Sequence, residues 1–421
     1  MFADKVIYNI KTLYTSSLQA PLRGKDLAKI DEYHNAFIAI KNGKILAFGE
    51  GSFSKYISIK TKKINAEGKI VLPGFIDSHS HLVHASSREE EFALLKKGYS
   101  YLDILKQGGG ILNTVSKTRA SSFSSLLKQA KTSLLKMLSY GVTTLEVKSG
   151  YGLDLINELK QLEVIKVLNE EGPVKLVATY MGAHALPLEY KGKEEEYVAS
   201  IIRDLEVIKR LDYVEMVDVF CEEGVFSPSI TKHILTKAQD LNFKIRLHAD
   251  EIKPLGGAEL GVSLGAVSVD HLLATSLEGI KALGKSNTLA CLLPGTSFFL
   301  QKPFAKARLM LENNVAIAIG GDYNPGTCPT ENFQFIMHLA CNYLNLSPEE
   351  VLNAVTINPA YLLGLADTKG SIAVGKDADI LLLDSPNLAY MLYHFGINHV
   401  SDVYIQGKKV VSKQRIERNI L

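Results

Sequence analysis

Cysteines and long apolar runs are both scarce in this chain. Four cysteines occur among 421 residues, and they form no CxxC pair. A chain of this size needs no disulfide staples, so we expect reduced thiols, as in a cytoplasmic protein. No apolar run approaches the ~18 residues that a membrane-spanning helix requires. The first residues, MFADKVIYNIKTLY, also lack the basic and apolar segments of a secretory signal.

An excess of charge of either sign is absent as well. The chain has 47 Lys and Arg against 45 Asp and Glu, a formal net charge of +2. Proteins that bind nucleic acid or an anionic membrane usually carry an excess of positive charge, which this chain lacks. We therefore expect neither as a partner. A GxGxxG motif after an early strand is missing too, which argues against a dinucleotide-binding fold. What remains is ordinary globular composition, with 46% hydrophobic residues to build a core.

Both ends of the chain carry strand patterns. Apolar and polar residues alternate near the N-terminus, where Asn42-Gly43 predicts a hairpin turn, and again near the C-terminus. These segments are Lys5–Tyr14, Ala36–Phe48, Ala378–Asp384 and Val400–Val411. Neither end alone could bury much core. We therefore expect residues 1–65 and 366–421 to form one small β-sandwich domain, with two separate β appendages as the alternative.

The centre of the chain, residues 66–365, alternates short apolar runs with helical patterns such as Ser122–Leu138 and Leu153–Glu170. Such alternation predicts a parallel sheet. The candidate strands are Ile70–Ile76, Thr143–Val147, Lys175–Tyr180, Met216–Phe220, Lys244–Leu247, Ala266–Val269, Thr288–Leu292 and Val315–Ile319. Eight such units in one segment favour an α/β fold with a (β/α)₈ TIM-like barrel. An open doubly wound sheet is the alternative.

Histidines and an aspartate recur where these strands end, which is where barrel enzymes place their active sites. His79 and His81 follow the first strand, His248 ends the fifth, and Asp322 follows the eighth. Residues two apart on a strand point to the same side. Three imidazoles and one carboxylate suit Zn²⁺ or Fe²⁺ and leave room for water, as in a catalytic rather than a structural site.

Two segments then point to a family. VLPGFIDSHSHL at 71–82 resembles the first-strand signature of the amidohydrolase superfamily, and GKDADI at 375–380 resembles its return to the β domain. The resemblance implies a metal-dependent hydrolase. Members that hold two metals carry a carboxylated lysine at the end of the fourth strand. Here Glu222 follows that strand and Lys148 ends the second strand instead, so a single-metal site is implied.

Further segments are similar to the members of this superfamily that open an imidazolone ring in histidine degradation. They include REEEF at 88–92, VKSGYGL at 147–153, GAHALP at 182–187, DVFCE at 218–222, HAD at 248–250 and GDYNPGT at 321–327. The resemblance implies hydrolysis of 4-imidazolone-5-propanoate to N-formimidoyl-L-glutamate. It also implies one divalent metal per chain, zinc or iron (Fe²⁺/Fe³⁺), and a homodimer.

The resemblance also suggests how protons are moved. Asp322 can bind the metal and accept a proton from the attacking water. Glu251 or His271 could carry that proton to the leaving nitrogen, and His271 could instead stabilise the oxyanion. The sequence does not rank these two residues.

A propanoate tail calls for a cation, and Arg88 follows the metal motif closely enough to grip it. The other expected substrate contacts are Tyr151, with its phenol and ring, His184, as a donor to the ring carbonyl or nitrogen, and Glu251, Asn324, Gly326 and Thr327. For Arg88 the alternative is a solvated arginine, and for Tyr151 it is core packing.

Two other functions compete. A cytosine-deaminase-like aminohydrolase acting on another cyclic amidine would share the same metal ligands, but a neutral base offers no carboxylate for Arg88. A metal-binding protein without catalysis would use the barrel only as a scaffold, and the proton-transfer candidates argue against it.

Overall fold

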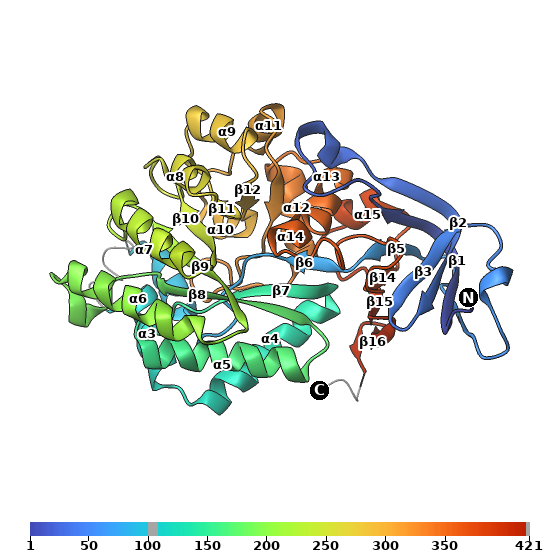
Figure 1. The fold of residues 1–421 in the computed structure, drawn as a ribbon, viewed down its shortest axis with the longest axis horizontal. Coiled ribbons are helices and arrows are strands. Elements are labelled where there is room, and N and C mark those ends of the chain that lie inside the picture. The colour runs from blue at the N-terminus through green and yellow to red at the C-terminus, as the bar shows by residue number, and fades with distance from the viewer. Residues whose placement is uncertain (100–107, 418–421) are drawn as a thin grey trace.

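The computed structural model describes residues 1–99 and 108–417, and its centre is a barrel of parallel strands (Figure 1). The eight strands of this sheet pair in the order β13-β12-β11-β10-β9-β8-β7-β6. They are β6 (Phe75–Asp77), β7 (Val142–Lys148), β8 (Lys175–Ala183), β9 (Val214–Cys221), β10 (Lys244–Ala249), β11 (Ser268–His271), β12 (Leu289–Leu292) and β13 (Ile317–Ile319). The expected barrel is thus confirmed.

The first and last strands meet just beyond their ends. Ser80 and Tyr323 form an isolated parallel bridge. The amide of Asp322 donates to the carbonyl of His79 at 2.9 Å, and the amide of His81 donates to the carbonyl of Tyr323 at 2.9 Å. Because these bonds join the two edges of the sheet, the alternative of an open doubly wound sheet is wrong. They also place the segment after β6 directly beside the segment after β13.

Helices surround the barrel, and several begin at a residue whose side chain caps the first turn. Ser122, Asp154, Ser227 and Ser276 each accept a hydrogen bond from the amide three residues later. The larger helices are α3 (Ile111–Ala120), α4 (Phe123–Ser139), α5 (Leu155–Glu171), α6 (Glu194–Lys209), α7 (Pro228–Asp240) and α12 (Phe333–Tyr343). The shorter ones are α1 (Glu89–Lys96), α8 (Gly257–Ser263), α9 (Leu277–Gly284), α10 (Pro294–Leu300), α11 (Ala307–Glu312), α13 (Pro348–Ala354), α14 (Ile357–Leu362) and α15 (Leu388–Tyr393), with 3₁₀ turns at Gly24–Ala28, Ser54–Tyr56 and Leu188–Tyr190. Within the described part of the chain, none of the helices has the length and apolar character needed to cross a bilayer.

A mixed sheet built from both ends of the chain lies beside the barrel, and the N-terminus lies on its side of the molecule (Figure 1). Its nine strands are β1 (Lys5–Thr15), β2 (Asp31–Lys41), β3 (Lys44–Glu50), β4 (Lys62–Asn65), β5 (Ile70–Pro73), β14 (Ile380–Leu383), β15 (Val400–Ile405), β16 (Lys408–Ser412) and β17 (Arg415–Ile416). Strand β5 pairs in parallel with β1 and antiparallel with β14. It therefore joins the N-terminal strands to the C-terminal ones, so the alternative of two separate appendages is wrong. The division at residues 65 and 366 stays a prediction.

The expected first barrel strand is wrong in one respect. The run Ile70–Ile76 does not form one strand but two, β5 in the mixed sheet and β6 in the barrel. The chain passes between the sheets at Gly74, where a Cβ atom would lie 2.2 Å from Oγ1 of Thr143. Both halves are buried, so a single apolar run carries no sign that it serves two sheets.

Candidate active site

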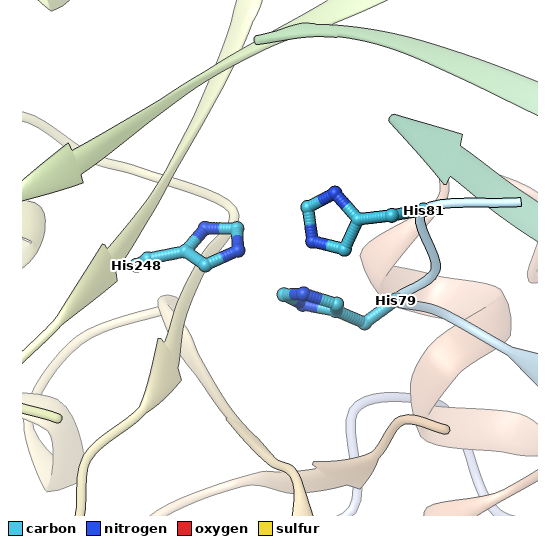
Figure 2. A group of neighbouring side chains, drawn as sticks. All are labelled: His79, His81 and His248. Atoms are coloured by element: carbon cyan, nitrogen blue, oxygen red, sulfur yellow. The ribbon is translucent and has the colours of Figure 1, made fainter. Parts of the chain in front are cut away.

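Three histidine side chains converge at the mouth of the barrel. His79 and His81 follow β6, His248 lies on β10, and their rings face a common point (Figure 2). One ring nitrogen of each lies within 4.8 Å of those of the other two. The Nε2 atoms of His79 and His248 are buried and have no hydrogen-bond partner among the described residues. Buried polar atoms are normally satisfied, so these nitrogens fit a metal ion.

Asp322 completes the set of four predicted ligands. Its Oδ1 lies 3.4 Å from Nε2 of His79 and 3.7 Å from Nε2 of His81, and its other oxygen accepts a hydrogen bond from the hydroxyl of Thr296. Burial raises the pKa of Asp322 above its usual value. A metal ion in contact with the carboxylate would counter that effect, because an adjacent positive charge favours the charged form. Three nitrogens and one oxygen thus form a donor set that fits Zn²⁺ or Fe²⁺.

Two carboxylates orient the ligand rings from behind. Asp270 Oδ2 lies 2.7 Å from Nδ1 of His79, and Asp218 Oδ1 lies 3.0 Å from Nδ1 of His248. Each Nδ1–H donates to its carboxylate, which leaves the Nε2 lone pair for a metal. Burial holds the pKa of His79 well below its usual value. Burial also works to lower the pKa of His248, but the adjacent charge of Asp218 raises it overall.

The two residues expected to transfer protons lie together. Nε2 of His271 is 3.7 Å from Oε2 of Glu251, and the ring centres of His271 and His248 are 5.2 Å apart. Glu251 is 16% exposed and His271 only 4%, so the glutamate is the one in contact with solvent. His271 has a φ of 76°, a left-handed backbone conformation that is uncommon for a non-glycine residue and frequent at functional sites.

A buried glutamate anchors the loop that carries Glu251. The carboxylate of Glu222 accepts hydrogen bonds from the amides of Glu251 at 3.1 Å, Ile252 at 2.9 Å and Lys253 at 3.2 Å. Glu222 directly follows β9, the position at which the two-metal relatives are expected to carry a carboxylated lysine. Here the side chain at this position binds backbone amides.

Tyr151 and His184 line the same mouth from the adjacent strands. The ring of His184 stacks on that of His81 with centres 4.9 Å apart, and Tyr151 lies 5.4 Å from His184. Nδ1 of His184 donates to the carbonyl of Gly150 at 3.0 Å, and burial lowers the pKa of His184 to about 3. The ring is therefore neutral, and its Nε2 carries a lone pair. This Nε2 is therefore a hydrogen-bond acceptor, and direct contact with a substrate stays a prediction.

Arg88 reaches across from the start of α1 to the loop after β13. A Cβ atom at Gly326 would lie 1.9 Å from Nη2 of Arg88, so the guanidinium lies flat against this glycine. The Arg88 side chain is 13% exposed, and its Nε, 3.5 Å from a carboxylate oxygen of Glu91, has no hydrogen-bond partner among the described residues. Arg88 is thus a largely buried cation with donor capacity to spare, which excludes the simple solvated arginine.

Asn324, Gly326 and Thr327 form a closed turn. Oδ1 of Asn324 accepts from the amides of Gly326 at 2.9 Å and Thr327 at 2.7 Å, and its Nδ2 donates to the carbonyl of Asp322 at 2.7 Å. These polar groups are engaged with one another. Their visible contribution is to hold the Asp322 backbone and to leave room for Arg88, and direct contact with a substrate stays a prediction.

Sequence reasoning missed several buried polar residues around the site: Glu146, Glu158, Asp218, Glu222, Arg246, Asp270 and Thr296. A signal for some of them was present. Glu146 and Lys148, like Arg246 and His248, are two apart on a strand, and residues at that spacing point to the same side. No such pattern marks Glu158 or Glu222, because each acts through backbone amides that only the fold brings to it.

The fold and the site define a barrel hydrolase with a histidine-rich metal site, and comparison with known proteins agrees. Residues 70–410 match the amidohydrolase family. The imidazolonepropionase of Fusobacterium nucleatum is 49% identical over 98% of this chain and 100% of its own, and that of Caldanaerobacter subterraneus is 50% identical over 98% and 99%. The chain therefore belongs to the amidohydrolase family and, within it, to the imidazolonepropionases.

Solved structures share the fold at much lower identity. An adenosine deaminase from Xanthomonas campestris with bound zinc superposes with a TM-score of 0.72 at 16% identity, covering 99% of this chain and 94% of its own. Guanine deaminase from E. coli superposes with a TM-score of 0.71 at 16% identity, covering 97% and 99%. At such identities the likeness establishes the architecture alone.

Proposed function

We propose that the protein hydrolyses 4-imidazolone-5-propanoate to N-formimidoyl-L-glutamate in histidine degradation. The observation that carries this proposal is the meeting of two unlike features at one barrel mouth. One is a group of three histidines and Asp322 suited to a divalent metal. The other is the largely buried cation of Arg88, which a substrate with a carboxylate tail requires.

We further propose that His79, His81, His248 and Asp322 hold one zinc or iron ion per chain. Such an ion, when bound, lowers the pKa of water towards ~7 and polarises a carbonyl oxygen. The histidines supply neutral nitrogens, because Asp270 and Asp218 accept the Nδ1 protons of His79 and His248.

The protein's own groups move the proton. Asp322 accepts it from the attacking water as the new C–O bond forms at the ring carbonyl. The ring bond between that carbon and the adjacent nitrogen then breaks, and Glu251 or His271 delivers a proton to the nitrogen. Because Glu251 contacts solvent, it is favoured as the group that exchanges protons with water. Because His271 is buried, His271 is favoured as the hydrogen-bond donor to the developing oxyanion.

Substrate orientation falls to groups around this centre. Arg88 pairs with the propanoate, Tyr151 faces the ring, and His184 accepts from a ring N–H. Asn324 and Thr327 hold the turn beneath Arg88, and Gly326 leaves it space.

We also propose that the protein is a cytoplasmic homodimer. Exposed aromatic rings on α10, α12 and α15 and just after α15 support a second copy as partner, since large apolar patches mark interaction sites. Phe298 is 43% exposed, Tyr343 is 48%, Tyr393 is 77% and Phe395 is 58%. Light scattering of the purified protein at several concentrations measures its mass, and a monomer throughout would refute this assembly.

The decisive assay follows the absorbance of freshly generated imidazolone propanoate with purified protein, with and without a chelator. Chelator-sensitive loss of absorbance with formimidoylglutamate as product is the expected result. If fully metallated protein leaves the substrate intact, the substrate assignment fails. Release of ammonia from aminopyrimidines or other cyclic amidines would then favour a deaminase.

A further inference from the structure

Beneath the ligand histidines lies a layer of buried charged side chains, which we term the charge layer. Its members are Glu146, Lys148, Asp218, Arg246 and Asp270, and all five are fully shielded from solvent. They come from the adjacent strands β9, β10 and β11 and from β7, which β8 separates from β9. A barrel core is normally filled by branched apolar residues, so a charged layer here needs an explanation.

The charge layer connects directly to two ligand rings. Asp218 contacts His248 Nδ1 at 3.0 Å with one oxygen and Lys148 Nζ at 2.8 Å with the other. Oδ2 of Asp270 contacts His79 Nδ1 at 2.7 Å and Arg246 Nη2 at 2.6 Å. Each carboxylate thus lies between a buried cation and an imidazole whose remaining nitrogen points into the metal site.

Lys148 lies close to every carboxylate of the charge layer. Its ammonium lies 2.9 Å from Glu146 and 3.9 Å from Asp270, in addition to its contact with Asp218, so it approaches all three carboxylates. Arg246 reaches only Asp270 and, at 3.4 Å, Glu146. Lys148 is therefore the one cation of the layer that contacts Asp218, the carboxylate behind His248. A buried carboxylate without a cation beside it is strongly disfavoured, so Asp218 depends on Lys148 to stay in place.

We propose that Lys148 is a positioning residue for the metal centre: by holding Asp218 it fixes the ring of His248 and thereby sets the affinity for the divalent metal. The inference rests on the proposed metal site but not on the identity of the substrate. A lysine that only stabilised the barrel through an ion pair would not need a partner that contacts a ligand histidine. Asp218, the partner of Lys148, does contact His248.

The test compares K148M with K369M. Methionine keeps most of the volume and removes the charge. Lys369 is a matched control, since it is 8% exposed, contacts Asp379 at 2.6 Å and Asp377 at 3.2 Å, and lies in the segment that leads into the mixed sheet. Affinity for Zn²⁺ is measured by competition with a chromophoric chelator in the absence of substrate. The visible spectrum of the Co²⁺-loaded protein reports ligand geometry.

We expect K148M to bind Zn²⁺ roughly 10- to 100-fold more weakly and to alter the Co²⁺ spectrum, because Asp218, the outer partner of His248, then loses its position. K369M should lose thermal stability and keep both metal properties. A folded K148M with the affinity and spectrum of the unaltered protein overturns the proposal.

Should K148M fail to fold, E146Q/K148M removes one charge of each sign and restores the net charge of the layer. The same weakened binding supports the proposal, and unaltered binding refutes it. Metal affinity is measured without substrate. A protein that binds metal but leaves imidazolone propanoate intact would therefore refute the proposed function and would not refute this inference.

Discussion

At the scale of single residues, the proposed metal ligands and the proposed substrate cation lie on different segments of the chain. His79, His81, His248 and Asp322 gather at the mouth of the barrel, while Arg88 lies against the turn at Gly326. Substitutions in the two groups should therefore change different measurable quantities.

Asp322→Ala should remove most of the activity. In the proposed mechanism the carboxylate both completes the metal ligands and accepts the proton of water, and a general base contributes roughly 100- to 10,000-fold to a rate. Turnover and metal content are measured together, with the exposed Asp384→Ala as control. Activity within tenfold of the unaltered protein would contradict the placement of Asp322 in the site.

Arg88→Ala should raise KM sharply while metal content stays normal, because a charge-assisted contact to the propanoate is lost. Such contacts contribute about 1.5–3 kcal/mol, or roughly 10- to 150-fold in KM. Gly326→Ala should have a similar effect, since the added methyl occupies the space of the guanidinium.

The pair of substitutions offers a sharper test. If both act through the same guanidinium, the double variant R88A/G326A should be little worse than R88A alone. If the fold-changes in KM of the two single variants multiply in the double variant, Gly326 contributes independently of Arg88. An equal loss of metal in R88A would instead point to a structural role for the arginine.

At the scale of elements, buried carboxylates fix the loops that follow the barrel strands. Glu222 holds the loop after β10 through three amides. Glu158 on α5 accepts from the amides of Gly150, Gly152 and Leu153 and so shapes the loop that presents Tyr151. Loops carry catalytic groups only where something holds them rigid.

Glu222→Gln should lower kcat by about tenfold or more with metal content unchanged. The amide keeps the shape of the carboxylate but loses its charge and half of its acceptor capacity, so Glu251 loses its fixed position. The adjacent and exposed Glu223 provides the control in E223Q. A kcat equal to that of E223Q would show that the loop holds its shape without this anchor.

At the scale of the whole molecule, stability should depend on pH through a half-buried carboxyl on α6. Burial raises the pKa of Asp204 to about 6 from its usual 3.8. The folded state therefore binds this proton more tightly than the unfolded state. The stabilisation is fully present below pH ~4 and is lost as the pH rises through ~6.

Asp204→Asn imitates the protonated form, so it should stabilise the protein at pH 7 and have no effect at pH 4. Partial exposure limits the gain to about 1 kcal/mol or less. Chemical denaturation at the two pH values measures it, with Asp212→Asn on the following turn as control. An equal effect at both pH values would rule out this titration as the cause.

Several features follow from local sequence. The helical segments Ser122–Leu138 and Leu153–Glu170, the central strands such as Lys244–Leu247, and the strand-end histidines were predicted, because periodicity and strand-end position are local properties. The division of Ile70–Ile76 between two sheets was not, since both halves are equally apolar. The anchoring by Glu222 and the space at Gly326 were not either, because their partners lie far away in the chain.

The sequence by itself determined the barrel, through its strand pattern, and the family, through its motifs. It also predicted which histidines and which aspartate meet, because they all follow the ends of parallel strands. The tertiary structure decided how those residues are held. It set Asp218 and Asp270 behind the ligand rings, put Lys148 between carboxylates, and laid Arg88 against the turn at Gly326. Such contacts join distant strands through buried charges, whose energies depend on desolvation and distance, and only the packed fold fixes both.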